Sequence, residues 1–344
     1  MVSGLMKQFE RAGARRGVLM AVGILLCLLP AVAPAQKLFV EDSDQSAKLV
    51  DAIYVKGLRY LVKAQGEDGA WVGGRYGAEP AVVGLATLAM LAHGDDPNFG
   101  PYAAPVRKGL DYILKAQTED GMIGRTMYNH GFATLALAEA YGMVKEPRLG
   151  PALQRAVKLI LTSQAQNPKG AWRYNPTSQD ADTTVSGCQM VALLAARNAG
   201  IAVPEEAIKK GLQFFAVCQS PQGGYGYTSA AGPNAARTAI ACLALTLAKE
   251  KGSKEHEAAF AYLQQQQPQS HYYFYYLYYA SQAHFHYSPA KWRVWNQRNI
   301  AELKQRQRPD GHWDGQFGPA YSTSMALLSM ALNYRFLPIY ERNY

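Results

Sequence analysis

The sequence has few of the residues that would mark a disulfide-bonded, metal-binding or nucleic-acid-binding protein. Of its four cysteines, the three beyond the N-terminal region stand singly in apolar stretches, at Cys188, Cys218 and Cys242. An odd number without paired spacing argues against a disulfide framework and a cysteine-rich zinc site, so we expect buried free thiols. Lysine and arginine are scattered without a basic run. We therefore expect no nucleic-acid partner, no metal and no cofactor.

A long hydrophobic run is also missing from the N-terminal region. The apolar run at residues 18–29 has 12 residues, whereas an ordinary membrane span needs about 20. Four basic residues precede it and Pro-Ala-Val-Ala-Pro-Ala follows at 30–35. This pattern predicts a signal peptide over residues 1–35 and export to the periplasm or the medium. The alternative is an uncleaved membrane anchor at 18–29. Removing the four basic residues and Glu10 lowers the formal charge from +9 to +6.

What the chain has in abundance is an internal repeat. Each copy contains an amphipathic helix that ends near a glutamine, then a turn with glycine and an aromatic residue, then an apolar helix. The glutamines lie 40 to 55 residues apart, at Gln65, Gln117, Gln164, Gln219, Gln267 and Gln307. That period is typical of helical-pair repeats, and no linker interrupts it. We therefore expect residues 36–344 to form a single domain.

The two helices of each repeat differ in polarity. The first type has one apolar stripe, as at Val106, Leu110, Ile113 and Leu114, so its other face is solvated. The second type is apolar nearly all round and rich in small residues, as at 81–92 and 238–248. Such a helix must be covered on all sides. The sequence predicts an all-α fold, an (α/α)6 toroid of six helical hairpins with the apolar helices inside; an open solenoid is the alternative.

The string Gly-Leu-Arg-Tyr-Leu-Val-Lys-Ala-Gln-Gly-Glu-Asp-Gly-Ala-Trp at 57–71 resembles the QW motif of squalene and oxidosqualene cyclases. The repeats, over about 45–335, resemble the prenyltransferase/squalene-oxidase repeat superfamily. This resemblance implies the toroid of terpenoid cyclases and protein prenyltransferases. The chain is most similar to exported bacterial members with one toroid and no assigned activity. The fold hosts several chemistries, so the resemblance alone does not give the function.

Two aspartates form the candidate catalytic site. Asp180-Ala-Asp182-Thr-Thr, before the third apolar helix, resembles the DxDD acid motif of squalene-hopene cyclases, with Thr183 in place of its last aspartate. Clustered carboxyls can keep one of them protonated, as alkene protonation requires. The alternative is an ordinary helix N-cap. The prenyltransferase branch implies zinc, but Ser322 stands where a histidine ligand would fall.

The segment 270–287 is unusually rich in tyrosine. On a helix four of these tyrosines share one face, at Tyr272, Tyr275, Tyr276 and Tyr279. We interpret them as a ligand-binding aromatic wall of a central cavity, able to hold an isoprenoid, stabilise a cation or stack on sugars. The alternative is that they fill the core.

Alignment of the repeats places further polar residues at the same end of the ring as Asp182. We call this set the polar collar and expect it to bind ligand at one mouth of the toroid: Glu79, His130, Arg237 and Tyr321. The alternative is that each side chain bonds within its own repeat.

Three functions are consistent with these features. The first is a non-catalytic ligand-binding or scaffold toroid, with an isoprenoid lipid or a carbohydrate as ligand, or an envelope protein as partner. The second is an isoprenoid-active enzyme of the cyclase or isomerase type, with Asp182 as the acid. The third is a carbohydrate-active toroid, although no diagnostic carboxylate pair is visible. The oligomeric state stays open.

Overall fold

The computed structural model describes residues 44–268 and 270–340, so the expected signal peptide at 1–35 and the alternative anchor at 18–29 lie outside the described residues. The described part is helical, with isolated β-bridges and no strand. Among its helices none combines the length and hydropathy needed to cross a membrane. The three cysteines of this part are buried and free, as expected.

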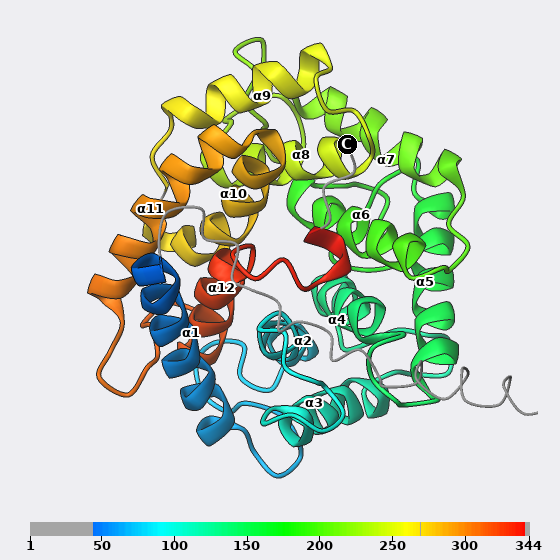
Figure 1. Cartoon of the computed structure of the whole chain (residues 1–344). Coiled ribbons are helices and arrows are strands. Elements are labelled where there is room, and N and C mark those ends of the chain that lie inside the picture. Colours follow the sequence, from blue (N-terminus) through cyan, green and yellow to red (C-terminus); the bar gives the residue numbers. More distant parts are fainter. Residues whose placement is uncertain (1–43, 269, 341–344) are drawn as a thin grey trace, which may run out of the picture. The chain divides into compact units, whose positions relative to one another are not determined.

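The helices form two concentric rings (Figure 1). The outer ring consists of α1 (Asp44–Ala64), α3 (Ala103–Lys115), α5 (Leu149–Gln166), α7 (Glu205–Cys218), α9 (Lys254–Gln265) and α11 (Pro289–Arg306). The inner ring consists of α2 (Pro80–Leu91), α4 (Met127–Ala140), α6 (Thr183–Asn198), α8 (Ala235–Leu247), α10 (Tyr273–Tyr287) and α12 (Pro319–Ala331). Because α12 packs on α2 as well as on α10, the inner ring is closed. The predicted (α/α)6 toroid is therefore confirmed.

Small residues let the inner helices approach one another closely. In α2 every residue except Ala81 is buried. A Cβ atom on Gly84 would come within 2.9 Å of the Phe132 carbonyl oxygen of α4. A larger side chain there would separate the two helices, which explains why the inner helices are both apolar and rich in glycine and alanine.

The repeat glutamines join neighbouring hairpins. The Gln65 side-chain amide donates to the Gly69 carbonyl of its own turn, at 3.1 Å, and to the Pro105 carbonyl of the next outer helix, at 3.0 Å. Gln307 makes the same pair of bonds, to Gly311 at 2.9 Å and to Ile53 at 3.0 Å. The second bond of Gln307 links the last outer helix to the first, so the motif itself closes the ring.

A buried side chain follows each such glutamine and fills the space between hairpins; we call these side chains wedges (Trp71, Ile123, Trp172, Tyr225 and Trp313). The indole N–H of each tryptophan wedge donates to an outer-helix carbonyl, Trp71 to Leu61 at 2.8 Å and Trp313 to Leu303 at 2.8 Å. A Cβ atom on Gly57 of the next outer helix would lie 3.1 Å from the Trp313 ring. A wedge is thus enclosed by its own outer helix, its own inner helix and the next outer helix.

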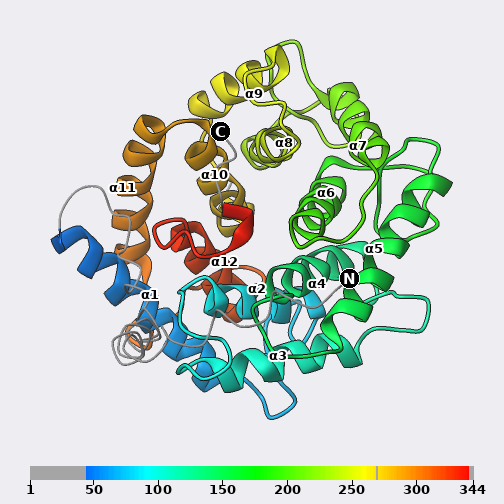
Figure 2. The ribbon, with the colours of Figure 1, turned by 45° about the vertical axis from the view of Figure 1, so that its right-hand side comes forward.

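The C-terminal segment covers one end of the ring. After α12 the chain crosses to η2 (Pro338–Tyr340), which lies at the centre of the ring against α6 (Figure 2). The Ile339 amide donates to the Glu139 carboxylate near the end of α4, at 3.3 Å, and Tyr340 is buried. Deeper in the ring Phe132 and Tyr278, from opposite inner helices, meet with ring centroids 6.2 Å apart. The C-terminal segment does not cover the other end, at which the inner helices begin; we call that end the mouth.

Candidate functional site

The mouth carries a group of partly exposed aromatic side chains, which we call the aromatic rim. They come from the loops that lead into the inner helices, from η1 (Ser270–Tyr272), or from the first turns of those helices: Tyr76, Tyr128, Tyr174, Tyr227, Tyr272, Phe317 and Tyr321. Exposed aromatic rings gathered at one place on a protein commonly mark a binding surface.

The rim forms two arcs. In the first arc Phe317 is central, with ring centroids 5.2 Å from Tyr76, 6.0 Å from Tyr272 and 5.4 Å from Tyr321. In the second arc the Tyr128 and Tyr174 rings are 5.9 Å apart. The hydroxyls of Tyr174 and Tyr227 are hydrogen-bonded at 2.7 Å. Each arc joins residues from different repeats, and the first arc, which brings Tyr76 to Phe317, exists only because the ring is closed.

The predicted tyrosine wall is divided between different surroundings. Tyr275 and Tyr279 are buried beneath the rim, with their ring centroids 5.0 Å apart. Burial raises the pKa of both phenols well above the usual value, so both are neutral. Tyr276 lines a pocket on the side of α11, and Tyr272 is 43% exposed at the rim. The four residues therefore do not form one continuous wall.

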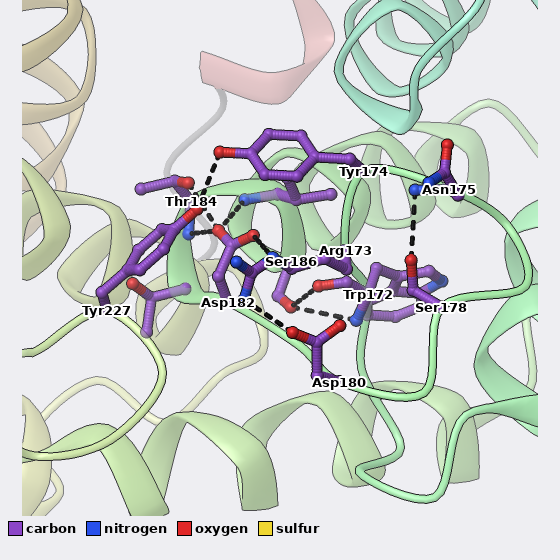
Figure 3. Close-up of polar contacts among 12 residues, drawn as sticks. Trp172, Arg173, Tyr174, Asn175, Ser178, Asp180, Asp182, Thr184, Ser186 and Tyr227 are labelled. Carbon is purple, nitrogen blue, oxygen red and sulfur yellow. Dashed lines mark hydrogen bonds and ion pairs between the residues drawn. The ribbon is translucent and has the colours of Figure 1, made fainter.

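Asp182 caps the N-terminus of α6 (Figure 3). Its Oδ1 atom accepts hydrogen bonds from the backbone N–H groups of Thr184, at 2.8 Å, and Val185, at 2.9 Å, and from the Thr184 hydroxyl. Asp182 is fully buried, and burial raises the pKa of its carboxyl in spite of these hydrogen bonds. The N-cap alternative is thus what the geometry shows, while a catalytic role stays a hypothesis.

Arg173 connects the two aspartates of the candidate catalytic site. Its guanidinium lies 3.0 Å from Asp180 Oδ2 and 3.5 Å from Asp182 Oδ2, and it lies over the Tyr174 and Tyr227 rings at 5.5 and 5.1 Å. Asp180 is largely exposed and lines a pocket of about 460 Å³ beside Arg173. Sequence reasoning missed Arg173, Tyr174 and Tyr227. The available signal was the aromatic residue that recurs between a wedge and the next inner helix.

The polar collar is only partly assembled. Tyr321 belongs to the aromatic rim, and Arg237 lies over the Tyr227 ring at 5.1 Å while donating to the Gly232 carbonyl. Glu79 accepts a hydrogen bond from Asn129 of the next repeat. His130 lies in the first turn of α4, but its side chain is fully buried.

The contacts of His130 favour the alternative reading, in which the side chain bonds to nearby backbone groups, while ligand binding by His130 stays a prediction. The side chain is fully buried, its Nδ1 atom accepts from the Ile123 amide at 3.1 Å, and its Nε2 atom lies 3.0 Å from the Ala156 carbonyl oxygen. Burial lowers the pKa of His130 to about 4. This histidine therefore supports a wedge and the outer helix α5. Within residues 44–268 and 270–340 no group of three or more His, Cys, Asp or Glu side chains is arranged to hold a metal ion.

Comparison with known proteins supports the toroid. The model of a family described as Domain of unknown function (DUF6288) matches residues 50–326, and the chain belongs to this family. A lanosterol synthase of Aspergillus fumigatus is 30% identical over 147 residues, which are 38% of this chain and 18% of that protein. A squalene–hopene cyclase of Zymomonas mobilis is 27% identical over 215 residues, 52% of this chain and 32% of that protein. The chain thus spans less than a third of these relatives.

Solved structures show the same fold. The type II terpene cyclase MstE from Scytonema, in complex with merosterolic acid A, matches with a TM-score of 0.59 at 16% identity. The match covers 84% of this chain and 98% of the MstE chain. A glycoside hydrolase family 76 mannosidase from Bacteroides thetaiotaomicron has a TM-score of 0.65 at 10% identity, covering 84% and 98%. The chain is a squalene-cyclase-like toroid, a fold that it shares with proteins acting on terpenes and on mannans.

Proposed function

We propose that this protein is an exported, non-catalytic toroid that binds an isoprenoid-type lipid across its aromatic rim. The observation that carries the proposal is a contrast at the mouth. Three tyrosines, Tyr76, Tyr174 and Tyr272, are about two-fifths exposed there, whereas Asp182, the candidate acid, is fully buried and serves as an N-cap. Export rests on the sequence pattern of residues 1–35.

The chemistry of the rim suits a neutral, apolar ligand. Tyr76 is 42% and Tyr272 is 43% exposed, so a ligand lying on them removes apolar surface from water, at about 25 cal/mol per Å². The nearby cations Arg173 and Arg237 are already placed over the Tyr227 ring. The relatives with assigned activities include a squalene–hopene cyclase, and MstE is also known in complex with geranylgeranyl dihydroxybenzoate. These similarities favour an isoprenoid over other apolar ligands.

The surroundings of Asp182 favour binding without turnover. A carboxyl that protonates an alkene must touch the substrate and must carry its proton toward it. Asp182 has no exposed surface, and its Oδ1 atom is held by donors from Thr184 and Val185. A ligand on the rim would be separated from it.

Binding can be measured by titrating the purified protein with geranylgeraniol and following intrinsic fluorescence. We expect saturable binding that weakens about tenfold in Phe317→Ala, because Phe317 packs on three other rim residues. Val217→Ala, at an exposed position of α7, is the matched control and should bind normally. α-1,6-Mannotriose is the competing ligand. Saturable binding of the trisaccharide with none of the lipid would replace this proposal by the carbohydrate alternative.

A second candidate is an isoprenoid-active enzyme with Asp182 as the acid. It is favoured by the raised pKa of the Asp182 carboxyl, whose Oδ2 atom contacts Arg173 at 3.5 Å and accepts no hydrogen bond among the described residues. It predicts a cyclised product when the protein is incubated with squalene or geranylgeranyl substrates, detected by gas chromatography and mass spectrometry. Asp182→Asn should then abolish the product and leave lipid binding intact. Absence of product from every substrate favours the binding protein.

A further inference from the structure

The fifth repeat lacks a wedge. In the other repeats the wedge follows the motif glutamine by six to eight residues. Six residues after Gln267 stands Tyr273, which is already the first residue of α10. A pocket of about 460 Å³ is found here, lined by α9, α10 and α11. These are the three kinds of element that enclose a wedge elsewhere in the ring, so the pocket occupies the place of the missing side chain.

The residue that faces the pocket from the next outer helix is also exceptional. Eight residues before each motif glutamine the sequence has a small residue in five of the six outer helices: Gly57, Gly109, Ala156, Gly211 and Ala259. At Gly57 the absence of a side chain leaves room for Leu327 of α12 and for the Trp313 wedge. In α11 the equivalent residue is Asn299, which lines the pocket. A polar amide therefore stands where a wedge would meet a small residue.

Two buried polar atoms of the pocket have no partner in the described structure. Asn299 is 3% exposed; its Nδ2 atom donates to the Ser329 hydroxyl at 3.1 Å, and its Oδ1 atom is unpaired. His284 is 7% exposed and stacks on Trp295 at 5.5 Å, with Nδ1 unpaired. Buried polar atoms are nearly always paired, by protein, water or ligand. A ligand N–H group would pair with the Asn299 oxygen, and a polar ligand atom beside His284 would pair with its Nδ1 atom.

One residue lining the pocket, Leu263, is equivalent to the residues whose backbone carbonyls accept the indole N–H of a tryptophan wedge in other repeats. The tryptophan wedges donate to the residue four positions before the motif glutamine, namely Leu61, Ile160 and Leu303. The equivalent residue of the fifth repeat is Leu263, which lines the pocket. Its carbonyl oxygen accepts the Gln266 amide at 3.2 Å and retains a second lone pair.

We propose that this pocket binds an indole-type group, a flat aromatic ring with an N–H donor at its edge, which acts as a wedge supplied from outside the chain. Trp295 and Tyr276 are aromatic lining residues of the pocket, and the N–H donor pairs with the unpaired Asn299 oxygen or with the Leu263 carbonyl. The source is a free indole compound or a tryptophan side chain of a peptide. The site is separate from the aromatic rim and does not depend on the function proposed for it.

Isothermal titration calorimetry with the purified protein tests the proposal. The probe is N-acetyl-tryptophanamide, and its analogue methylated at the indole nitrogen lacks the donor. We expect saturable one-to-one binding of the first and at least about tenfold weaker binding of the second, because a buried acceptor is then left unpaired. A Gly-Gly-Trp-Gly peptide distinguishes the sources, since tighter binding of the peptide indicates a peptide ligand and equal or weaker binding a free compound.

Two variants test whether the probe binds in this pocket. Asn299→Leu removes the acceptor while keeping a similar branched shape, and should weaken binding at least about tenfold. His284→Phe removes a polar nitrogen of the pocket while keeping a stacked ring, and should also weaken binding. Val217→Ala is the control, and thermal melts confirm that each variant is folded. If Asn299→Leu does not fold, His284→Phe decides alone. Lack of binding at millimolar probe, equal binding of the methylated analogue, or unchanged binding by the folded variants would overturn the proposal.

Discussion

Closure of the ring depends on Gln307 in the same way as the joins within it depend on the other glutamines. Its amide donates to the carbonyls of Gly311 and Ile53, at 2.9 and 3.0 Å. Gln307→Ala removes both bonds. At about 1 kcal/mol of net stability for each, we expect a loss of about 2 kcal/mol in the free energy of unfolding. For a domain of this size that corresponds to a fall of roughly 4 °C in Tm.

Gln164 provides the matched comparison inside the ring. Its amide donates to Gly170 and Ala207, both at 2.8 Å, so Gln164→Ala removes two equivalent bonds. Urea unfolding of both variants, with the wild type alongside, measures the two losses under one condition. A closed ring predicts losses of similar size. If Gln164→Ala costs about 2 kcal/mol and Gln307→Ala costs almost nothing, the junction between α11 and α1 does not hold in solution and the reasoning fails.

Three further predictions concern single buried side chains. Trp313→Ala should destabilise the protein by about 3 to 5 kcal/mol in urea unfolding, because it leaves a cavity and removes the indole bond to Leu303; a loss below about 1 kcal/mol would contradict the role of the wedge. His130 has a pKa lowered to about 4 by burial, so its contribution to stability is complete above pH 6.5 and is lost as the pH falls toward 4, by up to roughly 3 kcal/mol; a flat stability profile over that range would refute this. The raised pKa of the Asp182 carboxyl gives the opposite pH dependence. The stabilising contribution of the protonated carboxyl is present at low pH and is lost as the pH rises through the raised pKa. Asp182→Asn keeps the N-cap, so its stability relative to the wild type should improve between pH 4 and pH 7; a variant that becomes relatively less stable over this range would contradict the raised pKa.

The fold was predictable because the repeats share one sequence pattern. The glutamine, the glycine turn and the wedge recur in register, and the structure uses them for the same bonds, as Gln65 and Gln307 show. Closure followed from the apolar character of the last inner helix, which an open solenoid would have left uncovered. The C-terminal segment was not predicted to cover one end, since no periodic pattern marks residues 332–340.

The site was less predictable because its residues do not follow the repeat. Tyr76 and Phe317 lie near opposite ends of the chain and meet only through closure, at 5.2 Å. Tyr275 and Tyr276 lie on one side of a helical wheel. Because α10 is covered on all sides, its periodicity does not indicate which neighbouring helix each side chain contacts. His130 lies one turn inside α4, and its ring points to α5 rather than to the mouth.

The same division between repeated and unrepeated features indicates where this toroid differs from others. The glutamine bonds and wedges fix the helices relative to one another, so substitutions there change stability before they change binding. Loops between a wedge and an inner helix are free of that constraint and carry Tyr76, Tyr174 and Phe317. The fifth repeat has lost its wedge, and Asn299 replaces the small residue that would face one. Differences in ligand between this chain and the cyclases or mannosidases of the same fold should therefore map to the mouth loops and to the pocket beside α11, and exchange of the loop containing Phe317 should alter binding while leaving the unfolding free energy nearly unchanged.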